Sequence, residues 1–408
     1  MNSAGRGEVA PARLPRAVKL FGLVSLLNDF ASEMIYPLLP AFVTGVLGAG
    51  AGALGALDGA AEFAAAVVKY GAGRLADRPA RRGRLVVLGY ATAVLVRPLI
   101  AFTGAAWQVI GLRVVDRLGK GLRTPPRDAL IADVTPAALR GRAFGLQRGL
   151  DHAGAVLGPL VAWWLLAHRG ASLRTVIGAS LIPGIAVLLL ATWAVRGGQG
   201  RSGAVGVDSR SGPLSPPASY RPLPPLTASS RPLPPILLAI SFFYLVRMPE
   251  TLIILRSQQL GVAVTVVPLL WAAVHVVKSS TSFVGGRWSD RFGAERTMWI
   301  GWLCYAALAA GFGAAASAAW AWALFLALGI VAGLTESPER ALVARLAGGR
   351  QGSGFGVYHG VTGLAALIGG VALGVVFQRY GAGPAFVASA AAGAALVLSW
   401  PVLSKGAG

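Results

Sequence analysis

The chain has 408 residues, of which 55% are apolar and only 13% charged, and its mean hydropathy is +0.64. Soluble domains carry about 25% charged residues, so this composition excludes a soluble globular protein. The net charge of +21 is large enough for nucleic-acid binding, but the placement of the cations along the chain argues against that class.

Apolar runs of about 20 residues, long enough to cross the hydrocarbon layer, recur along the whole chain. We therefore predict an all-α membrane protein with twelve transmembrane helices in two pseudo-symmetric six-helix bundles. The predicted spans are 17–43, 54–76, 84–104, 107–131, 143–167, 175–196, 236–257, 262–287, 296–315, 319–345, 354–378 and 383–403. The N-terminal bundle covers 1–196 and the C-terminal bundle 236–408. Residues 197–235, rich in Pro, Gly and Arg, are expected to form a cytoplasmic linker, with a site for Pro-rich recognition as the alternative.

The cations gather on one side of these spans. If the N-terminus is cytoplasmic, most Lys and Arg residues fall in cytoplasmic segments, and the opposite side holds Arg169, Arg174, Arg256 and Arg379. This is the positive-inside pattern of a multi-pass membrane protein. We expect both termini in the cytoplasm, a retained first span rather than a cleaved signal peptide, and no nucleic-acid partner. The single cysteine, Cys304, excludes an internal disulfide and a thiolate metal cluster.

The two halves repeat each other in sequence. Gly73–Arg78 returns as Gly286–Arg291, Gly121–Ala132 matches Gly333–Ala344, and Phe144–Leu146 matches Phe355–Val357. The offset drifts only from 213 to 211 across these blocks. A chain built twice in this way is typical of secondary transporters.

These repeated motifs resemble those of the major facilitator superfamily, and the resemblance covers nearly the whole chain. It implies that the loop after the second span of each half is a gating motif that latches the halves on the cytoplasmic side. The residues that match are Gly73, Asp77, Arg78, Arg82, Gly286, Asp290 and Arg291. A basic loop that only sets membrane topology is the alternative.

Carboxylates inside the first two spans are candidate proton sites. Asp29 and Glu33 are spaced i,i+4 on one helix face, and Glu62 in the second span has His275 as its repeat counterpart. Acids in a membrane span persist where they face a cavity or a partner, so we expect Asp29, Glu33 and Glu62 to line a central cavity. Structural pairing is the alternative, as a satisfied interface histidine is for His275. Asp58 is expected to be solvated near the outer interface.

The fourth span carries the densest charge. Arg113, the deepest cation, is the candidate for a cavity-facing arginine, whereas Lys120 through Asp128 are expected to snorkel or pair nearer the cytoplasm. The segment around Arg113 resembles the family's span-4 arginine motif, with Asp116 and Arg117 in place of Gln-Gly. The pairs Arg127–Asp128 and Glu339–Arg340 have exchanged signs at repeat-related positions, which predicts ion pairs between the halves.

The fifth span contains an antiporter-like motif, Gly154, Gly158 and Pro159. It resembles the Gly-Pro motif of antiporter members of the superfamily, although Ala162-Trp163 replaces the trailing Gly-Gly. Close packing of small residues is the alternative interpretation.

We therefore predict a proton-coupled secondary transporter that exports a small organic solute by antiport. Proton-linked uptake of an organic anion, siderophore-like or a sugar, is the alternative, and a non-transporting receptor or scaffold is the alternative of another class. No motif of an enzyme, metal site or cofactor site was found, so neither catalysis nor a cofactor is expected. A monomer in a bacterial cytoplasmic membrane is expected, since richness in Ala, Gly and Arg fits a GC-rich genome.

Overall fold

The computed structural model describes residues 14–76, 79–135, 140–202, 235–347 and 351–405. Every regular element within these ranges is helical. The first half contains α1 (Arg16–Glu33), η1 (Tyr36–Leu38), α2 (Leu39–Ala41), η2 (Phe42–Val46), α3 (Ala51–Ala76), α4 (Pro79–Leu99), η3 (Ile100–Phe102), α5 (Ala106–Asp133), α6 (Arg140–Arg169), α7 (Leu173–Ala179) and α8 (Leu181–Ser202). The second half contains α9 (Pro235–Val246), α10 (Glu250–Gln259), α11 (Val267–Phe292), α12 (Ala294–Ala314), α13 (Ala318–Ala347), α14 (Gln351–Tyr380) and α15 (Ala382–Lys405).

Nine stretches of the described helices are long and apolar enough to cross a membrane. This confirms a multi-pass helical membrane protein. α1 and α5 are not among these stretches because each carries several charged residues. α11 is not among them either, but there the unbroken run of described side chains, 267–282, holds one charged residue, Lys278, and is too short to be judged. The prediction of twelve spans stays a prediction for those three.

The first predicted span is not one continuous helix. After Glu33 the chain passes through a short 3₁₀ turn that contains Pro37, then a few α-helical and π-helical residues. The predicted span 236–257 is broken in the same way between α9 and α10, where Pro249 is the residue before α10. Proline cannot donate a backbone hydrogen bond inside a helix, and Pro37 and Pro249 lie at matching places in the repeat. Both breaks leave helix ends inside predicted spans, where polar groups can reach backbone atoms.

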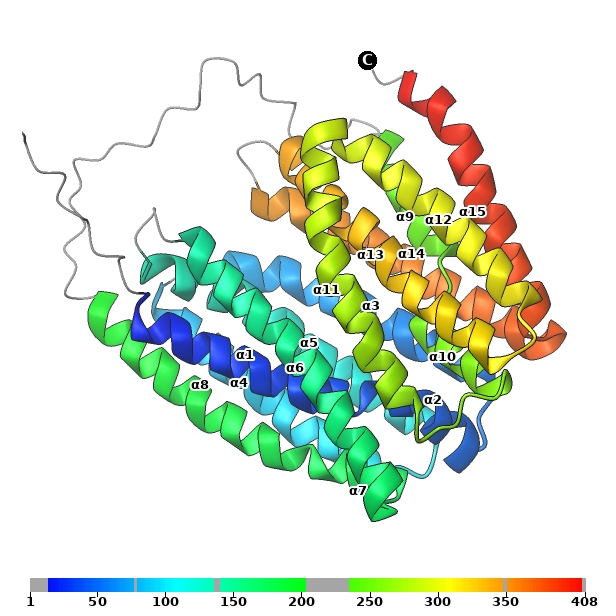
Figure 1. The fold of residues 1–408 in the computed structure, drawn as a ribbon. Helices are drawn as coiled ribbons and strands as arrows, with labels where there is room; N and C mark the ends of the chain where they lie inside the picture. Colours follow the sequence, from blue (N-terminus) through cyan, green and yellow to red (C-terminus); the bar gives the residue numbers. More distant parts are fainter. Residues whose placement is uncertain (1–13, 77–78, 136–139, 203–234, 348–350, 406–408) are drawn as a thin grey trace, which may run out of the picture.

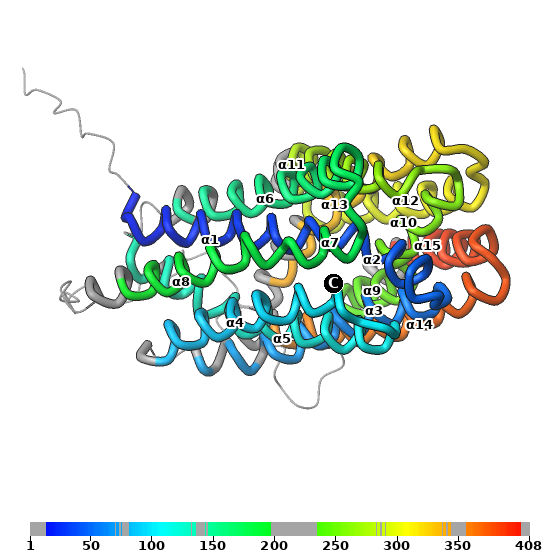
Figure 2. The backbone as a smooth tube through the Cα atoms, turned by 90° about the horizontal axis from the view of Figure 1, so that it is seen from below, coloured from blue at the N-terminus to red at the C-terminus, as the bar shows by residue number. Residues whose placement is uncertain are grey.

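The helices of each half pack mainly against one another, and a few pairs join the halves. In Figure 1 α1, α4, α5, α6 and α8 form one group, and α9, α12, α13, α14 and α15 form the other, with α3 and α11 running between them. Across the halves, α3 packs along α14 and α6 packs along α11, as Figure 2 also shows. The aromatic core of the second half includes Phe243, Trp302 and Tyr305.

Glycines allow the cross-half pair α3–α14 to approach very closely. A Cβ atom added at Gly55 would overlap the backbone of Gly370, and one added at Gly59 would lie 2.7 Å from the Cα of Leu367. Small residues of this kind permit backbone-to-backbone packing in membranes, where apolar surface gains little from association with other apolar surface. The contact places the first part of α3 directly against the second half.

Candidate functional site

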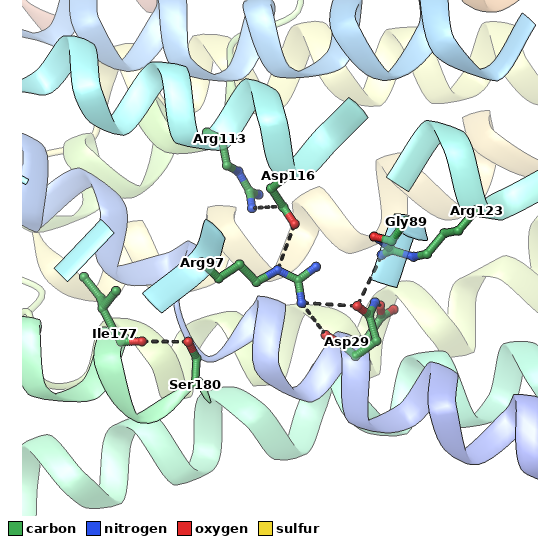
Figure 3. Close-up of polar contacts among 9 residues, drawn as sticks. Asp29, Gly89, Arg97, Arg113, Asp116, Arg123, Ile177 and Ser180 are labelled. Carbon is green, nitrogen blue, oxygen red and sulfur yellow. Dashed lines mark hydrogen bonds and ion pairs between the residues drawn. The ribbon is translucent and has the colours of Figure 1, made fainter. Parts of the chain in front are cut away.

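A buried carboxylate on α5 organises the charges of the first half. Asp116 is 1% exposed, and its two oxygens face two arginines: Arg97 Nε at 2.9 Å and Arg113 Nη1 at 3.1 Å. Close contacts between opposite charges offset part of the cost of removing these groups from water. Figure 3 shows Asp116 between the two guanidinium groups.

Asn28 on α1 joins this cluster to the predicted proton site Asp29. Arg97 donates to the backbone oxygen of Asn28 at 3.1 Å and to its Oδ1 at 3.2 Å, and Arg123 donates to Oδ1 at 3.3 Å. Asn28 Nδ2 in turn donates to Asp29 at 2.9 Å. In Figure 3, Arg97 and Arg123 converge on the segment of α1 that carries Asp29. Asp29 therefore belongs to a network with Arg113 rather than standing alone.

Sequence reasoning did not single out Arg97. It lies inside the apolar third span, beside Pro98, and it is 5% exposed. A cation at that depth is itself an indication of a partner, but nothing in the sequence names Asp116 and Asn28 as those partners.

Arg113 is enclosed in this conformation, with 2% of its surface exposed. Its guanidinium lies over the ring of Tyr36, 5.0 Å from the ring centroid. Its Nε and Nη2 have no hydrogen-bond partner within the described ranges, nor does Nε of Arg117, the next cation along α5. Lys120, one turn further, is exposed. Along this stretch of α5, Arg117 is partly exposed and Lys120 is exposed, whereas Arg113 is buried.

Glu33 reaches across the two halves. It accepts a hydrogen bond from Trp271 Nε1 of α11 at 2.9 Å. The Trp271 ring also contacts Tyr36, with ring centroids 5.0 Å apart, and His275, with centroids 4.9 Å apart. The structure thus brings together two residues that the sequence proposed separately, Glu33 and His275. His275 itself bonds through Nδ1 to the carbonyl oxygen of Trp271 at 2.9 Å.

Glu62 differs from the other acids because its side chain is exposed. The described part of the chain offers it no hydrogen bond or ion pair, and the charges that act on it most strongly are those of Arg117, Lys69 and Lys120. Glu62 is thus an exposed carboxylate in the electric field of nearby cations, and its place in a central cavity stays a prediction.

The expectation that Asp58 is solvated is wrong. Its oxygens accept from the hydroxyl of Tyr36 at 3.1 and 3.2 Å, and Oδ2 also accepts from Thr251 Oγ1 at 2.8 Å and from Thr251 N at 3.1 Å. The physical reason is the break before α10. The first N–H groups of a helix have no partner inside it, and Asp58 supplies one from the other half of the molecule.

The predicted ion pairs between the halves are not formed by the side chains that can be described. In the first half, Arg127 pairs with its neighbour Asp128 at 2.9 Å. In the second half, Glu339 accepts hydrogen bonds from Tyr358 at 2.9 Å and from Tyr244 at 3.2 Å. The side chain of Arg340 lies outside the described residues. Pairing between the halves stays a prediction, for another conformation of the protein.

The second half has its own charged contacts near the break before α10. Lys278 pairs with Glu336 at 2.7 Å, and Arg247 pairs with Glu250 at 3.4 Å. Glu250, Trp271, His275 and Lys278 line a small cavity there.

The gating motif is largely untested. Asp77 and Arg78 lie outside the described residues, as do the environments of Gly73 and Gly286 and the side chain of Asp290. Arg82 forms an ion pair with Asp133 at the end of α5, and Arg291 lies over the ring of Phe292, 5.3 Å from its centroid. The first contact ties the motif loop to α5 within one half.

The glycines of the antiporter-like motif pack α6 against α1. A Cβ atom at Gly154 would overlap the backbone of Leu26, and one at Gly158 would overlap that of Phe30. Gly369, the repeat counterpart of Gly158, meets the backbone of Leu245 on α9 in the same way. This contact supports the packing interpretation, and the antiporter interpretation stays a prediction. No group of three potential metal ligands occurs among the described side chains.

The helices, their packing and their buried charge network define a multi-pass membrane protein of the transporter type. The sequence model of the Major Facilitator Superfamily matches residues 21–369 and, in a second match, residues 236–406. The chain therefore belongs to the Major Facilitator Superfamily, which confirms the resemblance seen in its motifs.

Relatives of similar length carry no assigned substrate in their names. An uncharacterized MFS-type transporter of Methanocaldococcus jannaschii is 27% identical over 373 residues, covering 90% of this chain and 89% of the relative. An uncharacterized protein of Mycobacterium tuberculosis is 29% identical over 375 residues, covering 89% and 87%. A multidrug resistance protein of Photorhabdus laumondii is 31% identical over 135 residues, 33% of each chain.

Solved structures agree with the fold. The crystal structure of the nucleoside transporter NupG has a TM-score of 0.72 at 12% identity and covers 96% of this chain and 100% of that one. A POT family transporter in complex with a thioalcohol-conjugated peptide has a TM-score of 0.76 at 13% identity, covering 96% and 97%. Similarity at these identities establishes the fold and leaves the substrate open.

Proposed function

We propose that this protein is a proton-coupled secondary transporter that works by alternating access and exports a small organic solute by antiport. Two six-helix bundles, 1–196 and 236–408, would rock about a central site. Membership of the Major Facilitator Superfamily supports membrane transport. We further propose that the protein works as a monomer in a bacterial cytoplasmic membrane, with both termini and the 197–235 linker in the cytoplasm.

The observation that carries the proposal is the placement of the hydrogen bonds between the halves. The first part of α3 forms several of them: Asp58 and Leu54 contact Thr251, and Gly52 contacts Gln378. Glu33, at the break of the first span, contacts Trp271. In the proposed orientation these contacts lie on the extracellular side, which supports an inward-facing state in our proposal. A protein that alternates between two states needs contacts of this kind that can break.

The acids of the first half are placed to couple this change to protons. Protonation of Glu33 would weaken its hydrogen bond with Trp271, because a charged acceptor makes the stronger bond. Glu62 is accessible and has Arg117 beside it, so its charge state changes the field in which a solute would bind. Asp29 is linked through Asn28 to Arg97 and Arg123.

A reconstituted assay tests the coupling. Purified protein in proteoliposomes is given an imposed pH gradient and a panel of solutes, and solute and proton fluxes are followed together. The variants Asp29→Asn, Glu33→Gln and Glu62→Gln, combined, are expected to abolish gradient-driven movement. Glu295→Gln is the matched control, since Glu295 is an exposed acid at the start of α12. Gradient-driven transport that survives the triple substitution would remove these acids from the coupling mechanism.

A second candidate is proton-linked uptake of an organic anion. It is favoured by the unpartnered N–H groups of Arg113 and Arg117 and by the exposed Lys120 on the same helix. Guanidinium groups recognise carboxylates and phosphates through paired hydrogen bonds. Cells that express the protein would accumulate such a solute under this candidate and would exclude it under export.

A further inference from the structure

Glu339 occupies an unusual position in the second half. It lies on α13, is 1% exposed, and accepts two hydrogen bonds on a single oxygen, Oε2. The donors are the hydroxyls of Tyr358 on α14 and Tyr244 on α9, which are themselves 3.3 Å apart. Three helices of the second half therefore meet at one carboxyl group.

The charged groups around Glu339 are engaged elsewhere. On its own helix, Glu336 pairs with Lys278 of α11 at 2.7 Å. At the junction of α9 and α10, Arg247 pairs with Glu250 at 3.4 Å. On α14 the titratable neighbour is His359, whose ring lies against that of Tyr358 with centroids 4.9 Å apart. On α12 the hydroxyl of Tyr305 contacts Ser389 and Met248. Within the described ranges, Glu339 forms no ion pair.

Asp116 is the contrasting buried acid of this protein, because its partners are cations. It is equally buried, but each of its oxygens faces an arginine within 3.1 Å. Glu339 has only neutral hydroxyl donors at comparable distances. An ionised carboxylate in low-dielectric surroundings is expensive without a cation, whereas a neutral acid keeps one O–H donor and its acceptor capacity. Asp116 therefore has partners that stabilise a charged carboxylate, whereas the partners of Glu339 are also compatible with a neutral carboxylic acid.

We propose that Glu339 is a proton-binding site of the second half, separate from Asp29, Glu33 and Glu62. The two tyrosines hold Oε2, which leaves Oε1 to carry the proton. Deprotonation leaves a charge that attracts Arg247, whose own charge already acts on Glu339. Arg247 lies in the short connection between α9 and α10, the helix whose Thr251 holds Asp58. The proton state of Glu339 is thereby linked to the segment that closes one side of the molecule.

The role in coupling rests on the proposed transport function, but proton binding itself does not, so the test measures protonation directly. The full-length protein is reconstituted in lipid, and infrared difference spectra are recorded as a function of pH. A carboxylic-acid carbonyl band that appears on acidification and is absent from Glu339→Gln is the expected result. Tyr358→Phe should move the midpoint of this band to higher pH, because the ionised form loses a hydrogen-bond donor.

The controls separate Glu339 from the other acids and from misfolding. Glu295→Gln should leave the band unchanged. If Glu339→Gln does not yield folded protein, Glu339→Asp carries the test, because a shorter acid in the same place must shift the frequency or the midpoint. A spectrum in which none of the titrating bands responds to substitution at position 339 or 358 overturns the proposal, whether or not the protein transports a solute.

Discussion

Asp58 of α3 caps a helix that belongs to the other half of the molecule. Its Oδ2 accepts from both the backbone N–H and the hydroxyl of Thr251 on α10, at 3.1 and 2.8 Å. The same carboxylate accepts from Tyr36, whose ring supports Arg113. One acid thus connects the end of a helix in the second half to the charge network of the first.

Asp58→Asn should separate the two halves on the side where α3 contacts α10. The asparagine keeps the size of the side chain but removes the charge, and hydrogen bonds to charged groups contribute about 1.5–3 kcal/mol. Spin labels at Val46 and Ala263, exposed positions in the two halves, report the separation in a Cys304→Ser background. Double electron–electron resonance should show a larger population of long distances. Thr251→Val, which keeps the backbone donor, should have a smaller effect. Unchanged distances in both variants would show that the Asp58–Thr251 contact does not hold the two halves together.

Asp116→Asn should strongly destabilise the fold. It leaves Arg97 and Arg113 buried without their shared counter-charge, and breaking a buried pair by removing one partner costs about 3–5 kcal/mol. Thermal unfolding in detergent is expected to shift to markedly lower temperature.

A compensating substitution checks the cause of that effect. Adding Arg97→Gln to Asp116→Asn removes one of the stranded charges, so the double variant should be more stable than the sum of the two single effects predicts. Simple additivity would mean that the destabilisation comes from packing rather than from charge.

Much of the architecture could be predicted from the sequence because it depends on periodic, local properties. Apolar length predicts the spans, and the repeat predicts that a feature of one half recurs in the other, as the breaks near Pro37 and Pro249 and the glycines Gly158 and Gly369 do. The membrane-embedded charges were recognisable for the same reason, since each is an exception to an apolar pattern.

The partners of those charges could not be predicted. Asp58 was misplaced because a residue near a span end is usually solvated, and its actual partner depends on where α10 begins and how α3 packs against α14. Glu339 and Arg127 suggested pairs by their signs, yet the nearer groups are tyrosines and a neighbouring aspartate. Which side chain pairs with which is decided by distances between helices, and these have no local signature in the sequence.

Gly154→Ala should disturb the contact between α1 and α6. The added Cβ would overlap the backbone of Leu26, so two helices would have to separate. Gly149→Ala is a matched control on the same helix, since its Cβ would meet no atom within 4 Å. Alanine in a helix interior is favoured over glycine by about 1 kcal/mol. The control should thus unfold at the same temperature or higher, and Gly154→Ala at a lower one. Equal unfolding temperatures for the two variants would show that this packing is not tight.

Trp271→Phe should weaken a second contact between the halves, the one between Glu33 and Trp271. It should also reveal whether this contact and the Asp58–Thr251 contact act together. Phenylalanine keeps a ring against Tyr36 and His275 but cannot donate to Glu33, which loses its bond across the halves. Because Tyr36 touches both Trp271 and Asp58, the two contacts share a partner, and such neighbours show interaction energies of about 0.5–3 kcal/mol. Open populations of the single variants and the Asp58→Asn/Trp271→Phe double variant, measured with the same spin labels, give this energy directly. A double variant whose effect equals the sum of the single ones would mean that Tyr36 transmits nothing, and that each contact closes the protein independently.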